Sequence, residues 1–274
     1  MILANYGVVS SSGGVSFDTD ALSFITAAAI TDNTQKTAIN TLVTDLKTYN
    51  IWTKMKALYP FVGGTASTHK WNLKDPRDLD AAFRLTFNGG WSHSSNGITG
   101  NALNTYARTY FVDTNLSINS SSYSIYNRTN TSQSGQTVDF GYLKLNSSYI
   151  SNLFSVNYSP VGYGGRVQSF TTTNATRTDY RGYYNGNRNN SADFNFHVNG
   201  VKTITGTEST SGKLLTGYEF YLGCLYIDGS IPATANYSTN NYAFAHISDG
   251  LTDTEASNLY TAVQTFNTTL SRQV

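Results

Sequence analysis

The chain has 274 residues, of which only 13% are charged, and its formal net charge is +1 at pH 7. This balance produces no general field that would attract nucleic acid or an anionic membrane, so we expect neither as a partner. No apolar run approaches the length of a membrane span. The single cysteine, Cys224, excludes an intrachain disulfide, and its apolar setting FYLGCLYI predicts a buried core residue.

The N-terminal part is predicted to be an arm followed by a helical module. Residues 1–19 contain a short apolar start and a Ser/Gly tract, which fit either a frayed end or a tether that orders against a partner. Apolar residues then recur at helical spacing, and Asp32 is a candidate N-cap. A third helical segment is expected over 52–59, before Pro60, so that residues 20–64 form a helical hairpin and a hinge.

From residue 65 to residue 250 the apolar spacing changes to period two, and turn residues interrupt it at short intervals. In the run FHVNGVKT, Asn199 and Gly200 accept the positive φ values of a two-residue hairpin turn. The candidate strands are 69–73, 81–87, 105–112, 122–126, 138–145, 153–158, 167–172, 180–184, 194–198, 202–205, 218–227 and 242–247. This pattern predicts an antiparallel β-sandwich and a mainly β fold class.

The last segment, 251–274, is predicted to be a helix. Thr252 and Glu255 form a capping-box pattern at its start, and apolar residues follow on one face from Ala256 to Leu270. We expect this helix to pack on the sandwich beside the N-terminal helices.

Two blocks of the sequence resemble known families. The runs NFHVNGVKT, YEFYLGCLYIDGS and AFAHISDGLTDTEASNLYTAVQTF resemble the second half of a concanavalin A-like (laminin-G-like) jelly roll. The run KMKALYPFVGGTASTHKWNLKDPRDLDAAFRLTFNGGWSHSSNG resembles a module repeated among bacteriophage virion proteins, including those of crAss-like phages. The blocks cover residues 20–100 and 194–272, and the resemblance implies a jelly-roll domain in a structural, fibre-like or tail-associated virion protein.

Catalytic patterns are absent from the sequence. The three Glu residues, Glu208, Glu219 and Glu255, form no E-x-D-x-x-E pattern of the kind that would supply the paired carboxylates of a glycosidase. The four His residues have no zinc-ligand spacing, and no G-x-S-x-G elbow is present. We therefore predict no catalytic residue, no metal site and no cofactor.

A tyrosine-rich stretch between residues 158 and 188 is the candidate binding site, and it lies outside both blocks of resemblance. Aromatic faces can stack on sugar rings, while Arg and Asn groups can bind hydroxyls or carboxylates. The alternative is that these are ordinary Tyr-rich strands. The candidate glycan- or receptor-binding residues are Tyr163, Tyr180, Tyr183, Tyr184, Arg181 and Arg188.

The sequence thus indicates a non-enzymatic component on the exterior of a virion, such as a fibre, spike or decoration protein, with a lectin-like sandwich that contacts host-surface glycan. The expected partners are other virion proteins, bound through the arm and helices, and further copies of this chain. Two alternatives remain at this point: a purely structural capsid or fibre protein without a ligand, and a polysaccharide depolymerase.

Overall fold

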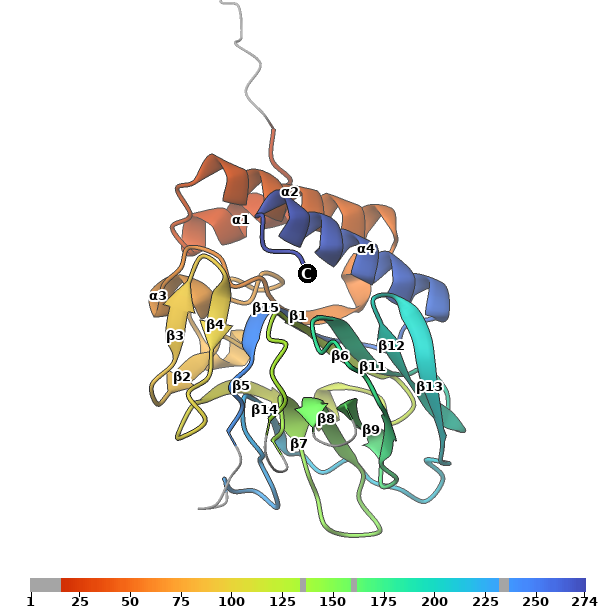
Figure 1. Cartoon of the computed structure of the whole chain (residues 1–274). Helices are drawn as coiled ribbons and strands as arrows, with labels where there is room; N and C mark the ends of the chain where they lie inside the picture. Colours follow the sequence, from red (N-terminus) through yellow and green to blue (C-terminus); the bar gives the residue numbers. More distant parts are fainter. Residues whose placement is uncertain (1–15, 134–136, 159–161, 232–236) are drawn as a thin grey trace, which may run out of the picture.

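The structure is a computed structural model that describes residues 16–133, 137–158, 162–231 and 237–274. Most of the predicted N-terminal arm, up to residue 15, lies outside these ranges. The described residues form three layers, which are a layer of helices, a first sheet beneath it and a second sheet below that (Figure 1). Within these ranges no helix is both long enough and apolar enough to cross a membrane.

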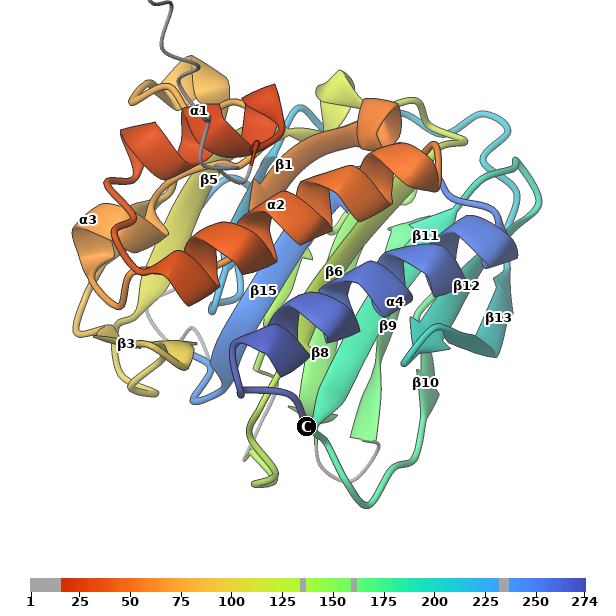
Figure 2. The same ribbon diagram turned by 90° about the horizontal axis from the view of Figure 1, so that it is seen from above.

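Local capping signals account for the ends of the long helices. The helices are α1 (Thr19–Ala27), α2 (Asn33–Thr48), α3 (Ala66–His69) and α4 (Asp253–Thr269). The Asp32 side chain accepts a hydrogen bond from the Gln35 N–H at the start of α2, and Thr252 and Glu255 form a complete capping box at α4. Helices α2 and α4 lie side by side across the first sheet (Figure 2), which confirms the predicted packing of the C-terminal helix.

The first sheet is antiparallel and has the strand order β13-β12-β11-β6-β15-β4-β3, with β1 paired to β15. Its strands are β1 (Met55–Tyr59), β3 (Ser92–Ser94), β4 (Gly97–Thr99), β6 (Ser121–Asn127), β11 (Gly182–Arg188), β12 (Asp193–Val198), β13 (Val201–Thr207) and β15 (Asn241–Ser248). Asn199 and Gly200, with φ values of 48° and 76°, join β12 to β13 as predicted.

The second sheet is also antiparallel and has the order β10-β9-β8-β7-β14-β5-β2. Its strands are β2 (Thr86–Asn88), β5 (Tyr106–Val112), β7 (Phe140–Tyr142), β8 (Ser151–Tyr158), β9 (Gly162–Ser169), β10 (Thr173–Ala175) and β14 (Glu219–Leu222). The two antiparallel sheets confirm the predicted fold class, a mainly β sandwich of the jelly-roll kind.

Three predicted elements are wrong, and one of them is the strand 81–87, because Asp80–Ala82 form a short 3-10 helix and only residues 86 and 87 belong to β2. Residues 55–59 form strand β1 and not a third helix, so the predicted helical module of residues 20–64 includes a strand of the sandwich. Both faces of β1 are buried, since Leu58 packs under the helices and Tyr59 packs between the sheets. A short, mostly apolar run of this kind fits the spacing of a helix as well as that of a buried strand. The predicted strand 69–73 is also wrong, because α3 ends at His69 and a turn follows.

The protein has two apolar cores, one on each face of the first sheet. One core lies between the helices and the first sheet, where Leu42, Phe244 and Phe266 meet. The other lies between the two sheets and includes Phe154 and Phe220. Both faces of the first sheet are therefore covered, whereas the outward face of the second sheet has no helical layer over it in the described part of the chain (Figure 1).

The position of Cys224 gives a direct test of the fold. Its side chain is fully buried, as predicted, and burial raises the pKa of the thiol, so little reactive thiolate forms at neutral pH. We expect iodoacetamide to leave the native protein unlabelled and to alkylate Cys224 once urea unfolds the chain, as measured by intact mass. Rapid labelling under native conditions would contradict this burial.

Candidate functional site

The six residues predicted to bind a glycan do not share a surface. Tyr183 and Tyr184 are neighbours on β11, so their side chains point to opposite faces of the first sheet. Tyr183 packs beneath the helices and Tyr184 packs between the sheets, and both are fully buried. Their predicted role as an exposed stacking surface is therefore wrong, because both faces of this sheet are covered.

Tyr163 and Arg188 are also enclosed. Tyr163 is only 5% exposed, and its hydroxyl donates to Thr203 Oγ1 at 2.8 Å. The Arg188 guanidinium is fully buried and donates to the carbonyl oxygens of Val167 and Glu208. Both side chains hold the sandwich together, so their prediction as surface ligand contacts is also wrong.

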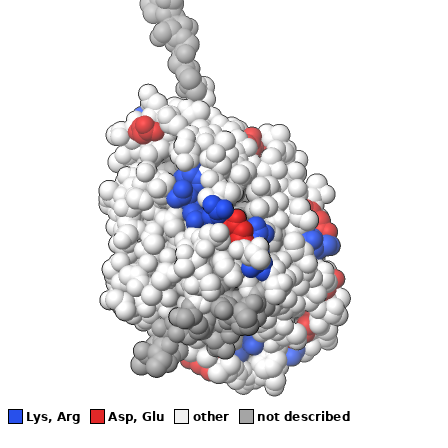
Figure 3. All heavy atoms as spheres, in the orientation of Figure 1, with Lys and Arg blue, Asp and Glu red and all other residues white. Residues whose placement is uncertain are grey.

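Tyr180 and Arg181 are the two members of the set that remain accessible. Arg181 lies at the surface and forms a bidentate ion pair with Asp179, from Nε to Oδ1 at 3.0 Å and from Nη2 to Oδ2 at 2.9 Å. Hydrogen bonds from Arg181 lower the pKa of Asp179 to about 2, so this carboxylate is charged at neutral pH. Figure 3, which has the orientation of Figure 1, shows a band of basic side chains with one acidic side chain among them. Ligand binding at this loop stays a prediction.

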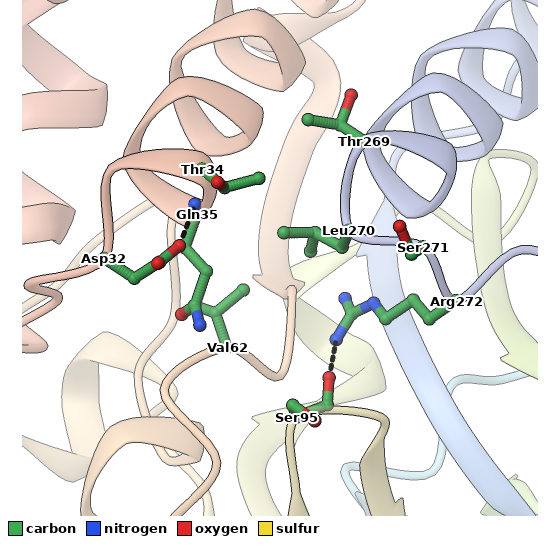
Figure 4. A pocket seen from close by; sticks show the side chains of 9 residues that line it. All are labelled: Asp32, Thr34, Gln35, Val62, Ser95, Thr269, Leu270, Ser271 and Arg272. Carbon is green, nitrogen blue, oxygen red and sulfur yellow. Dashed lines mark hydrogen bonds between the residues drawn. The ribbon is translucent and has the colours of Figure 1, made fainter.

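A cavity of about 260 Å³ lies between the start of α2 and the end of α4 (Figure 4). Two polar side chains at its edge already form hydrogen bonds within the protein, because Asp32 caps α2 and Gln35 Oε1 accepts from the Gly63 N–H at 2.8 Å. Residues from four separated segments line it: Asp32, Thr34, Gln35, Val62, Ser95, Thr269, Leu270, Ser271 and Arg272.

Arg272 is almost fully buried at this cavity and has no carboxylate partner. Burial lowers its pKa to about 9, which still leaves the guanidinium charged at neutral pH. All five N–H groups are used, and the acceptors are the Asn267 side chain and the carbonyl oxygens of Pro60, Phe61, Ser95 and Ala243. Arg272 therefore joins the end of α4 to β15, to the segment after β1 and to the β3–β4 turn, and it has no donor left for a ligand.

A third region, on the outward face of the second sheet, follows from strand alternation. Phe220 and Leu222 of β14 point into the core, so Glu219 and Tyr221 point outward. In β5 the same alternation places Arg108 outward, and the pairing of the two strands sets Arg108 directly opposite Tyr221.

Tyrosine rings dominate this outward face. Tyr221 stacks on Tyr226 with 4.1 Å between ring centroids and an interplanar angle of 13°, and the Tyr106 ring lies 5.9 Å from the Tyr221 ring. The rings of Tyr218 and Tyr226 meet edge to face at 6.1 Å. We call this region the tyrosine band, which consists of Tyr106, Tyr110, Tyr218, Tyr221 and Tyr226.

Two ion pairs lie within the tyrosine band. The Arg108 guanidinium sits 4.6 Å from the centre of the Tyr110 ring, and its Nη2 donates to Glu219 Oε2 at 2.7 Å. Lys144 Nζ lies 3.4 Å from Asp228 Oδ1 and donates a hydrogen bond to the Tyr218 hydroxyl at 2.9 Å. The band therefore offers apolar ring faces together with fixed polar groups, which is the combination that sugar recognition requires.

The sequence contains a signal for the outward face of the second sheet. Tyr106, Arg108 and Tyr110 alternate in the run YARTYFV, and Glu219 and Tyr221 alternate in the run YEFYL. Period-two spacing places such residues on one face of a strand, but spacing does not show whether that face is covered. The stretch 158–188 is equally rich in tyrosine, and most of its tyrosines face a core.

Two further carboxylates lie inside the protein. Asp139 is fully buried and accepts hydrogen bonds from Tyr242, Ser238 and Asn240, and burial raises its pKa. Asp113 is buried as well and accepts from the Tyr142 hydroxyl at 2.5 Å. Within the described ranges, no cluster of three or more His, Cys, Asp or Glu side chains could hold a metal ion.

Comparison with known proteins identifies the fold. No family model and no curated protein matches the chain. Among solved structures, the chain is similar to botulinum neurotoxin type C, whose cell entry is dependent upon interaction with two ganglioside molecules. This similarity has a TM-score of 0.53 at 14% identity and covers 79% of this chain and 53% of the toxin chain.

A second similar structure is a mutant of Trypanosoma rangeli sialidase displaying trans-sialidase activity, with a TM-score of 0.51 at 8% identity, covering 83% of this chain and 39% of the sialidase. A third is domain 4 of AbnA, a GH43 extracellular arabinanase from Geobacillus stearothermophilus, with a TM-score of 0.49 at 15% identity, covering 75% and 98%. The chain thus spans about half of the toxin chain and less of the sialidase. The first two similarities establish a β-sandwich fold.

Proposed function

We propose that the chain binds glycan through the tyrosine band and does not cleave it. The observation that carries this proposal is the run of partly exposed tyrosine rings beside fixed ion pairs, on a sheet face that no helix of the described ranges covers. Aromatic faces pack against the C–H surface of a sugar ring, and the polar groups beside them bind its hydroxyls. The ganglioside interaction of the similarly folded toxin supports a role of this kind.

The arrangement of the carboxylates supports binding without hydrolysis. Cleavage of a glycosidic bond with retention requires an acid and a nucleophile about 5.5 Å apart, and inversion requires a wider pair. On the tyrosine band, Glu219 is held by Arg108 and Asp228 by Lys144. Both carboxylates are therefore committed to ion pairs, which favours binding over hydrolysis.

We also propose that this lectin-like domain is displayed on the exterior of a bacteriophage virion, as part of a fibre, spike or decoration. The sequence block from Lys54 to Gly97, which resembles virion proteins, supports this role. The helical layer and the outward face of the second sheet lie on opposite sides of the molecule (Figure 1). The helices and N-terminal arm would then contact other virion proteins, and repeated copies would raise weak glycan affinity by about 10² to 10⁴ through avidity.

Two matched variants test the proposed site. We expect Tyr106→Ala to lower glycan affinity about tenfold or more, because it removes a partly exposed ring of the band. The double variant Tyr180→Ala and Arg181→Ala, in the accessible loop, should bind as the parent chain does. The measurement is titration on immobilised host-surface glycans, with thermal melting to verify folding. Loss of binding only in the double variant would place the site on the loop.

Two further measurements test the other parts of the proposal. Release of reducing ends from host polysaccharide would contradict a non-catalytic role. Localisation of this chain in purified particles, by its density in a whole virion, tests the virion role and reveals which side faces outward. A chain that is absent from particles would refute that role and leave the glycan-binding proposal standing.

A further inference from the structure

We propose that the glycan bound by the tyrosine band is uncharged, with sialylated and sulfated sugars excluded by the acidic partners of its basic residues. This inference rests on the proposed glycan-binding function of the band. It concerns the chemical class of the ligand, which the fold alone does not specify.

The first argument is charge balance. The basic side chains of the band are Arg108 and Lys144, and each has a carboxylate partner within 3.4 Å. Arg108 is 42% exposed at its side chain whereas Glu219 is only 10% exposed, so the acid is the more deeply held member of the pair. An anionic sugar on this face would therefore approach two carboxylates as well as two cations, with little net attraction.

The second argument is the geometry of the Arg108 guanidinium. Strong recognition of a carboxylate or sulfate uses two parallel N–H groups of the guanidinium fork. Arg108 Nε and Nη2 already donate to Glu219 Oε2, at 3.2 and 2.7 Å, and Nε also donates to Oε1 at 3.3 Å, so the Nε side of the fork is occupied. Glu219 Oε1 also accepts from the backbone N–H of Tyr110 at 2.8 Å, so the acid is fixed from two sides.

The remaining donors of Arg108 suit hydroxyls. Among the described residues, the two N–H groups of Nη1 and the second N–H of Nη2 have no hydrogen-bond partner. These N–H groups can donate to neighbouring sugar hydroxyls while the rest of the guanidinium stays bound to Glu219. The tyrosine hydroxyls at the margin of the band can both donate and accept, which again matches hydroxyl groups.

The third argument is the difference in exposure among the tyrosine rings. Tyr221 is only 6% exposed because it is stacked against Tyr226, so it supports its neighbours more than it contacts a ligand. Tyr106 and Tyr226 are half-buried and flank it, and they supply the accessible apolar surface. Association through such faces depends on burial of C–H groups and is insensitive to salt.

The first experiment uses an array of glycans arranged in matched pairs that differ only by a sialyl or sulfate group. The full chain should bind neutral members, lose about tenfold or more of this affinity on Tyr106→Ala, and change little between about 50 and about 500 mM salt. Tighter binding of acidic members that Tyr106→Ala abolishes would overturn the neutral class and keep the site. Absence of binding to every neutral member would overturn both proposals. Acidic binding that only Tyr180→Ala with Arg181→Ala removes would assign an acidic ligand to the loop and likewise overturn both.

The second experiment frees Arg108 from its acidic partner. Glu219→Gln retains an oxygen that can accept from the Tyr110 N–H but removes the negative charge. We expect this variant to bind the acidic member of a pair about tenfold more tightly than the parent chain does, with an affinity that falls as salt rises. The matched control is Asp249→Asn, which removes the partner of Lys56 outside the band and should leave the preference unchanged. An unchanged preference in Glu219→Gln would contradict exclusion by this carboxylate.

Discussion

Replacing Arg272 with Met is expected to lower the free energy of unfolding by about 4 kcal/mol. The guanidinium is 1% exposed and donates to four backbone carbonyl oxygens and one side-chain oxygen. Met fills a similar space but donates nothing, so these buried acceptors lose their partners. Each unsatisfied buried group costs about 1 to 3 kcal/mol, partly relieved by relaxation. The measurement is the urea midpoint at constant slope.

Two comparison variants test whether the loss of stability comes from the hydrogen bonds of Arg272, which we call the Arg272 clamp, and not from the loss of any arginine. Arg272→Lys should also be strongly destabilising, because one ammonium with three donors cannot reach five acceptors arranged around a planar group. Arg77→Met removes an arginine whose side chain is 63% exposed beside Asp75, and it should leave the urea midpoint almost unchanged. If Arg272→Met were equally mild, the clamp would not contribute to stability.

The second large effect is loss of stability in mild acid. Burial lowers the pKa of His246 to about 3, and burial together with His93 and Arg272 lowers the pKa of His69 to about 3. An unfolded histidine titrates near pH 6.5, so below this pH the unfolded chain binds protons that the folded chain does not. We therefore expect stability to fall by about 5 kcal/mol between about pH 6.5 and about pH 4.5. Urea unfolding across this range measures it.

The contacts of the two histidines explain why both stay neutral. His69 Nε2 accepts from the Gly64 N–H at 3.1 Å, which leaves its Nδ1 proton to donate to His93 Nδ1 at 3.0 Å. His246 lies between Ser124 and Ser248 in the first sheet. A second proton on either ring would need a buried charge without an acidic partner.

A substitution isolates the histidine contribution to acid sensitivity. His246→Gln removes one titrating group, so its stability should fall about half as steeply over the same pH range, whatever its absolute value at neutral pH. Asp139 acts in the opposite direction, because its raised pKa adds stability as pH falls. A slope unchanged by His246→Gln would show that other groups govern the acid response.

Features that depend on neighbouring residues were predictable from the sequence. The cap at Asp32, the capping box of Thr252 and Glu255, and the turn at Asn199 and Gly200 all occur where expected. Each is decided by hydrogen bonds or φ values within a few residues, so no distant contact is needed to specify it. The same applies to the sandwich class, since period-two spacing reflects local strand geometry.

The identity of the exposed tyrosines depended on the tertiary structure. Tyr184 and Tyr221 both lie on strands with alternating residues, yet one points between the sheets and the other toward the uncovered face. Strand β1 shows the same dependence. Its apolar spacing is compatible with a helix, and only its pairing with β15 and the burial of both its faces specify a strand. Local sequence therefore determined the sandwich and its closing helix. The packing of the helices and of the second sheet against the first sheet decided which tyrosines can meet a ligand, because spacing records the face of a strand but not what covers it.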